Sequence, residues 1–516
     1  MESTDIDHPS TGGFALIYQN PYLLGVASFS TLGGLLFGYD QGVVSGVITM
    51  ESFGARFPRI YSDSGFKGWF VSTLLLAAWF GSLINGPIAD RLGRKLSMNV
   101  AVAIFVVGSA IQCGAVNIPM LFIGRAIAGL AVGQLTMIVP LYISEVSIPD
   151  IRGGLVVLQQ REPNTPVSIL SYWIDYGTNY IGGTRCAPSI PYTGHTKNTL
   201  TFNPYTDVPP SGCTGQSEAS WRLPLAIQIL PALILGLGIT FFPDSPRWLL
   251  MKERDDDAIT ALSELRRQAR ESPQLIHEYL EIKASIMLES AFARDHFPNL
   301  SGVQLHAAQY MSFLTTWARF KRLAIGCCVM FFQQFMGCNA MIYYAPTIFG
   351  QLGLDGNTTS LLATGVYGIV NCLSTLPALF LIDKIGRRIL LMSGAVGTCI
   401  SLVIVGALIG AYGSDLINHR SAGIIGLITP DMLDSITWGT YIFFAAFCLL
   451  ALAFTYFCIP ETRGKTLEDM DLIFGDTAAH EEKQRIVQIE AELRGTQAPD
   501  KDNLVKPSVQ QEEYVV

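Results

Sequence analysis

Long apolar stretches, separated by short polar links, occupy most of this chain. Ten of them reach the length that a helix needs to cross the hydrocarbon core of a bilayer, which is about 20 residues. They lie near residues 23–48, 69–89, 96–116, 120–143, 155–176, 221–242, 323–349, 360–382, 389–412 and 436–459. The pattern predicts an all-α, polytopic membrane protein.

One polar stretch, residues 243–320, separates the sixth and seventh apolar runs. Its segment 255–289 has helical spacing and few Gly or Pro, which predicts short amphipathic helices. Lys and Arg collect in this stretch and are few in the loops expected on the opposite side. Because Lys and Arg mark the cytoplasmic side of a membrane protein, we expect both chain ends in the cytoplasm. Residues 1–20 lack the pattern of a cleavable signal peptide, so the first apolar helix is expected to act as the targeting signal.

Composition agrees with a membrane protein and excludes several other classes. Half of the residues are apolar, 15% are charged and the mean hydropathy is +0.36, which is unlike a soluble domain. The net charge of −8 belongs mostly to the ends and the central loop, so it indicates no partner. The cysteines form no CxxC or Cys/His cluster, so we expect no metal and no cofactor. No nucleophile–base arrangement or phosphate-binding loop indicates an enzyme, and we expect no nucleic-acid partner.

A short basic motif occurs twice, each time between two apolar runs. It reads DRLGRK at residues 90–95 and DKIGRR at residues 383–388. Such a repeat indicates two similar halves. The expected parts are a tail (1–22), an amino half (23–242, with an external loop at 177–220), a cytoplasmic helical loop (243–320), a carboxyl half (321–460) and a second tail (461–516).

The repeated loops are predicted to take part in gating, although they would also serve as plain topology signals. The segment SEVSIPDIRG (144–153) supplies an acidic partner for the first copy. The gating candidates are Asp90, Arg91, Arg94, Glu145, Arg152, Asp383, Arg387 and Arg388.

Carboxamides inside the apolar runs are the candidates for solute binding. They offer both donors and acceptors without charge, as sugar hydroxyls do. The candidates are Gln160, Gln333, Gln334, Asn339 and Asn371; for Asn371, contact between helices is an equal alternative. On an ideal helix Gln334 and Asn339 lie about 140° apart, so they face one solute only if the helix is broken, which Gly337 and Pro346 permit.

Asp40 and Arg125 are strong charges deep in the apolar runs of the amino half. Neither is tolerated against lipid, so we expect them to pair. A carboxylate whose protonation competes with a nearby Arg suits a proton-coupled carrier. A static ion pair is the alternative.

The chain resembles the sugar porter family of the major facilitator superfamily. The likeness extends from about residue 23 to 471 and rests on GYDQGVVSG (38–46), ADRLGRK (89–95), GRAIAGLAVG (124–133), PLYISEVSIPDIRG (140–153), PDSPRWLL (243–250), QQFMGCNAMIYYAP (333–346), DKIGRR (383–388) and PETRGKTLEDMD (460–471). The resemblance implies twelve helices in two six-helix halves with a midplane solute site, and sugar-binding residues at the amide positions. It implies a carrier for a hexose-like sugar or polyol, coupled to a proton. The external loop is similar to that of filamentous-fungal members.

Two departures from the family pattern affect this expectation. The fifth run contains Arg161, Glu162, Pro163, Asn164 and Pro166, which make a poor spanning sequence. The second half also lacks its tenth helix and the start of the eleventh, because only AGIIGLITPDMLD (422–434) resembles the family there. A mis-predicted exon boundary explains both departures more simply than evolutionary loss. A non-transporting sugar sensor and an inactive paralogue are therefore the alternatives to a working carrier.

The remaining expectations concern the surface and the setting of the protein. Asn357, in an Asn-Thr-Thr sequence after the seventh run, is a glycosylation candidate. Cys186 and Cys213 lie in one external loop, where they can pair. We expect a monomer in the plasma membrane, surrounded by lipid, whose ligands are a small sugar and a proton.

Overall fold

The computed structural model of the protein describes residues 21–147, 164–296, 317–337, 342–346, 357–412 and 438–461, apart from residues 31, 197 and 198, and single positions at 304, 308 and 311. Contacts divide the chain into two compact units. One comprises Met1–Asp244 and Ala324–Gly464, and the other Ser245–Leu323 and Lys465–Val516.

The amino part of the first unit is a group of long helices. They are α2 (Pro21–Ser30), α3 (Leu32–Val47), α6 (Ser64–Leu92), α7 (Arg94–Cys113), α8 (Ile118–Val146), α10 (Asn164–Thr178), and α11, α12 and η1, which together cover residues 219–241. The short helices α4 (Glu51–Arg56) and α5 (Pro58–Ser62) join α3 to α6. Glycines allow close packing: a Cβ on Gly133 of α8 would lie 1.9 Å from the Ala78 carbonyl of α6.

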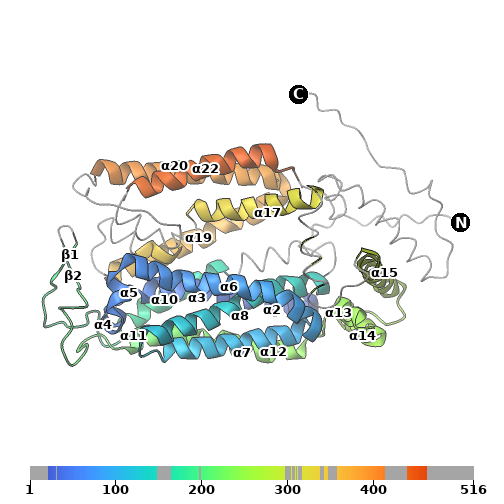
Figure 1. The fold of residues 1–516 in the computed structure, drawn as a ribbon, viewed down its shortest axis with the longest axis horizontal. Helices are drawn as coiled ribbons and strands as arrows, with labels where there is room; N and C mark the ends of the chain where they lie inside the picture. Colours follow the sequence, from blue (N-terminus) through green and yellow to red (C-terminus); the bar gives the residue numbers. More distant parts are fainter. Residues whose placement is uncertain are drawn as a thin grey trace. The chain divides into compact units, whose positions relative to one another are not determined.

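Among the described residues, four long helices follow in the carboxyl part of the chain. They are α17 (Trp317–Phe335), whose residues up to Leu323 belong to the second unit, and α19 (Asn357–Ile385), α20 (Arg387–Tyr412) and α22 (Trp438–Cys458). The last two run side by side (Figure 1). Helix α10 packs on α19, where a Cβ on Gly365 would lie 3.2 Å from the Trp173 ring. This contact joins the two parts of the unit.

The second unit contains α13 (Pro246–Met251), α14 (Asp255–Arg266) and α15 (Pro273–His296). Trp248, Leu249 and Ala258 are part of its small apolar core. The helices form where the sequence predicts amphipathic segments, and the ion pair between Arg266 and Glu278 joins α14 to α15.

The observed helices coincide with the predicted apolar runs. Within the described residues, six helices are long and apolar enough to cross a membrane: Ser64–Leu92, Arg94–Cys113, Ile118–Val146, Ala219–Phe241, Arg387–Ala407 and Gly439–Cys458. The other four runs contain α2 with α3, α10, α17 and α19. Residues 413–437, where helices are predicted to be missing, lie outside the described residues.

The start of the fifth run is only partly described. Residues 148–163 lie outside the described part, and α10 covers Asn164–Thr178. The expectation that Pro163 and Pro166 remove backbone donors and kink this span stays a prediction.

Candidate functional site

A buried ion pair joins two helices of the amino part. The Nη1 atom of Arg125, on α8, lies 3.3 Å from Oδ2 of Asp40, on α3, and both side chains are fully buried. The Arg125 Nε donates to the Phe70 carbonyl of α6 at 3.1 Å, and its guanidinium lies 5.0 Å from the centre of the Phe70 ring. The sequence expectation that these charges pair agrees with this geometry, and their role in proton coupling stays a prediction.

The seventh run is interrupted beside this pair. Helix α17 ends at Phe335, Gly337 has a φ of +84°, and residues 342–346 are again helical. Gly is suited to a positive φ because it has no Cβ. Tyr343, after the break, is within electrostatic range of Arg125 and Asp40 and belongs to the same buried cluster as Tyr39 of α3. The broken helix that Gly337 was expected to permit is therefore present.

The predicted solute-binding amides are only partly described. Gln333 and Gln334 are exposed on α17, and Asn371 is half-buried on α19. The neighbouring Phe331 contacts the ring of Phe447 of α22 edge-on, and Phe335 contacts it in a tilted arrangement, so the aromatic face of α17 is used for packing. Gln160 and Asn339 lie outside the described residues. The described amides thus lie on two helices of the carboxyl part, and that they bind one solute stays a prediction.

The first basic loop makes a bidentate ion pair. Arg94 donates through Nε to Glu145 Oε2 at 2.8 Å and through Nη2 to Oε1 at 2.7 Å. Its Nη1 also donates to Asp90 Oδ1 at 3.2 Å. Arg91, by contrast, is exposed and makes no ion pair among the described residues, so only one of the two predicted arginines contacts Glu145. Arg152 lies outside the described part.

The second basic loop has an acidic contact that the sequence did not predict. Glu461 accepts hydrogen bonds from the backbone amides of Arg387 and Arg388, each at 3.2 Å. A carboxylate at the start of α20 satisfies amides that have no partner within the helix. The loss of the tenth helix predicts that the Arg387 and Arg388 guanidiniums lack the acidic partner that the first copy has, and this backbone contact leaves that prediction untested. Asp383 lies in α19, and its side chain is not among those described.

Loss of Glu145 is expected to destabilise the protein strongly, because Arg94 is 4% exposed and its charge would remain buried. Glu145→Ala should lower stability by about 3–5 kcal/mol, measured as thermal unfolding of the detergent-solubilised chain. The matched control is Glu461→Ala in the second loop, where the side chain is half-buried and the contacts are to backbone amides. Equal effects of the two substitutions would contradict this interpretation.

The loop between α10 and α11 is cross-linked and anchored on α4. Cys186 and Cys213 form a disulfide, as the sequence allowed, and strands Gly194–Thr196 and Thr199–Thr201 form a hairpin. Glu51 of α4 accepts hydrogen bonds from the Tyr192 hydroxyl at 2.5 Å and the Cys186 amide at 2.7 Å. Burial raises the pKa of the Glu51 carboxyl, although these hydrogen bonds oppose the shift.

The contact between this loop and α4 is expected to be more stable at acidic pH than at alkaline pH. Because the folded pKa of Glu51 is raised, its stabilisation is complete below the ordinary value of 4.5 and is lost as pH rises through the folded value. Hydrogen-exchange protection of the Cys186 amide should therefore fall with rising pH in the wild type. In Glu51→Gln it should not change with pH; the same pH dependence in both proteins would refute the assignment.

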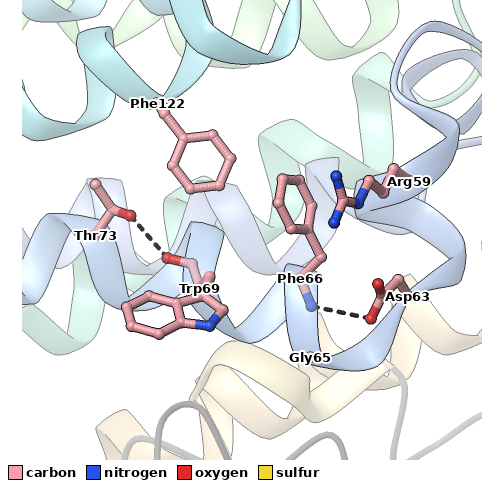
Figure 2. A pocket seen from close by; sticks show the side chains of 7 residues that line it. All are labelled: Arg59, Asp63, Gly65, Phe66, Trp69, Thr73 and Phe122. Carbon is pink, nitrogen blue, oxygen red and sulfur yellow. Dashed lines mark hydrogen bonds between the residues drawn. The ribbon is translucent and has the colours of Figure 1, made fainter.

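A shallow cavity of about 660 Å³ lies where α5, α6 and α8 begin. Figure 2 shows Phe66, Trp69 and Phe122 around it, with Asp63 accepting from the Phe66 amide. The Arg59 guanidinium lies 4.3 Å from the centre of the Phe66 ring. None of the predicted solute-binding or gating residues lines this cavity.

Sequence reasoning missed one carboxylate inside a predicted span. Asp175 of α10 is fully buried, as Asp40 is. The signal was present, because an ionisable residue inside a membrane span is a functional candidate by default. The signal is weak because Asp175 lies near the end of its apolar run.

Comparison with known proteins decides the family. The family model for "Sugar (and other) transporter" matches residues 26–421 and 414–474. The chain belongs to the sugar transporter family. As a member it is a multi-pass membrane carrier and not an enzyme. The two matched stretches overlap at residues 414–421. Helices of this sugar transporter chain are predicted from the sequence to be missing at this place.

Several relatives align with nearly the whole chain. The MFS glucose transporter mfs1 of Aspergillus flavus is 28% identical, over 92% of this chain and 94% of that protein. A probable quinate permease of the same species is 29% identical, over 88% of each chain. A structure of the xylose transporter XylE from E. coli, partially occluded and inward-open, covers 87% of this chain and 100% of its own at 25% identity, with a TM-score of 0.59. The chain therefore has the major facilitator fold.

Proposed function

We propose that this chain has the site of a carrier for a neutral monosaccharide, coupled to a proton by alternating access. The observation that carries the proposal is the Asp40–Arg125 pair, buried beside the interrupted seventh run. A carboxylate held by one guanidinium exchanges that partner for a proton when the surrounding helices move. Relatives named for glucose and a proton:xylose symporter with the same fold support this reading.

A neutral solute is favoured over a carboxylate such as quinate. The predicted contacts at Gln333, Gln334 and Asn371 carry no charge, and hydrogen bonds to amides suit hydroxyl groups. Arg125 already contacts Asp40 and the Phe70 carbonyl. The relatives named quinate permease make a cyclic acid the second candidate, which direct competition distinguishes.

The proposed orientation has both termini in the cytoplasm of a cell whose plasma membrane holds the protein. The basic loops at residues 91–95 and 387–388 then face inward. The Cys186–Cys213 disulfide gives independent support, because disulfides persist on the oxidising side of the membrane. The ion pair between Arg94 and Glu145 would close the inner side of the amino half. A monomer completes the proposal.

Equilibrium binding to the purified chain, with a segment restored between Tyr412 and Ser421, tests the solute class. Radiolabelled glucose should bind and be displaced by xylose, and quinate in excess should not displace it. A protein that binds quinate and not glucose would overturn the neutral-solute proposal. Binding of neither would favour an inactive paralogue.

Removal of one amide is expected to weaken sugar binding while the protein still folds. Gln334→Ala should raise the dissociation constant roughly 2- to 13-fold, since a hydrogen bond to a neutral hydroxyl contributes about 0.5–1.5 kcal/mol. Scintillation binding to the purified variant measures the change, and Gln274→Ala, an exposed glutamine in the second unit, is the control. Unchanged binding in Gln333→Ala, Gln334→Ala and Asn339→Ala would show that the site lies elsewhere.

A further inference from the structure

Asp175 is a fully buried carboxylate without a partner side chain among the described residues. It lies in the last turn of α10, which ends at Thr178. The Gly46 backbone amide of α3 is the polar group that faces the carboxylate, and within the described part of the chain neither a side chain donates to its oxygens nor a cation pairs with it. This is a different setting from that of Asp40, which has the Arg125 guanidinium at 3.3 Å.

The Asp175 carboxylate lies directly on the backbone of α3. A Cβ built on Gly46 would be 2.3 Å from Asp175 Oδ2 and 2.6 Å from its carboxyl carbon. Only a glycine at position 46 therefore leaves space for this side chain. The close approach also leaves no room for a water molecule between the carboxylate and α3.

The groups that face Asp175 supply no positive charge. From α3, Tyr39 is within electrostatic range of both Asp175 and Asp40. On α11, Arg222 is directed to the carbonyls of Cys113 and Ala115 and to Glu218. On α19, the segment 365–368 packs on α10, and its titratable residue is Tyr367. Asp383 and Lys384 lie at the other end of that helix.

An ionised carboxylate in such a place is strongly disfavoured, because it is fully buried and no cation among the described residues compensates its charge. The neutral acid avoids this penalty. Two carboxyls in neighbouring helices thus have opposite environments, since Asp40 is paired with a cation and Asp175 is not. Environments that separate two acids in this way assign them different protonation states.

We propose that Asp175 binds a proton in this conformation and is a second proton-binding site of the carrier, separate from Asp40. The O–H bond forms with a proton from water, and the proton returns to water when α10 and α3 separate. Gly46 is six residues from Asp40 on α3, or about 9 Å along the helix axis. A role of Asp175 in transport rests on the proposed function. The binding of a proton by Asp175 does not depend on it.

Infrared spectroscopy of the purified 516-residue chain tests this directly. The C=O stretch of protonated carboxyls, followed from acid to alkaline pH, should include a band that persists after exposed carboxyls have ionised. All variants are compared in a Glu51→Gln background, because Glu51 is also a buried acid with a raised pKa but lies outside the helices that cross the membrane. In that background Asp175→Asn should abolish the band, and Asp40→Asn should leave it in place.

A persistent band that survives in Asp175→Asn, or a wild type with no such band, would overturn the proposal. Asp175→Glu covers the case in which the asparagine variant does not fold: it keeps a carboxyl and should shift the band, and an unshifted band counts against Asp175. Glucose binding to the chain with a segment restored between Tyr412 and Ser421 separates the two ideas. A band lost in Asp175→Asn, together with no glucose binding by the restored chain, supports the proton on Asp175 and contradicts the proposed function.

Discussion

Sugar uptake is expected to appear only when the missing segment is restored between Tyr412 and Ser421. A restored chain has roughly forty more residues, about one span, a half-span and a loop at 20 residues per span. Helix α20 ends at Tyr412 and α22 begins at Trp438, and residues 413–437 cannot hold two spans and their connections. A carrier alternates by moving one closed half against the other, so an open half leaves its site unlined.

The measurement is uptake of labelled glucose by a host that lacks its own sugar transporters. One strain expresses the 516-residue chain and the other the restored chain, with the segment taken from the transcript or grafted from the Aspergillus flavus relative. The 516-residue chain should give only background uptake, and the restored chain saturable uptake. A graft of equal length with scrambled sequence is the control. Saturable uptake by the 516-residue form, with its mass confirmed, would refute the prediction.

Neutralisation of Asp40 is expected to abolish accumulation of sugar against a gradient and to spare downhill exchange. Asn has the shape of the protonated acid but does not titrate, so it uncouples sugar from the proton. It also leaves Arg125 without its anion at a fully buried position. Removal of one partner of a buried pair costs about 3–5 kcal/mol, so folding of the variant has to be verified first.

Sugar-induced alkalinisation of the medium reports on coupling in the restored chain. Asp40→Asn should lose it, while counterflow of labelled sugar continues. Asp256→Asn, an exposed acid on α14, should retain both activities. Wild-type uptake that is insensitive to pH and to uncouplers would point to facilitated diffusion and to a static role for the Asp40–Arg125 pair.

Local patterns in the sequence predicted the helices well because membrane spans are specified by length and apolarity alone. The runs 96–116 and 389–412 correspond closely to α7 and α20. The break after Phe335 was also predictable, because Gly337 relaxes the backbone constraint locally. The effect of Pro163 and Pro166 on the fifth run stays a prediction, since residues 148–163 lie outside the described part.

Contacts between distant residues were harder to predict. The sequence indicated that Asp40 and Arg125 pair, because two isolated charges in apolar spans have few other solutions. It did not indicate that Glu461 caps α20 at Arg387 and Arg388, since that contact joins residues far apart in the chain. The structure gives the exposure of the amides at 333, 334 and 371. That they bind one solute together stays a prediction.

The sequence by itself determined that this is a helical membrane protein built from two related halves, because apolar length and repeated basic loops are local properties. It also predicts an incomplete second half, which needs only a count of residues. The tertiary structure decided the contacts that no local pattern indicated. It selects Arg94 and not Arg91 for Glu145, places Glu51 on the disulfide loop, and places Asp175 against Gly46 with no cation beside it among the described residues. Whether a buried carboxyl has a partner depends on the helix packed across from it, which no local pattern specifies.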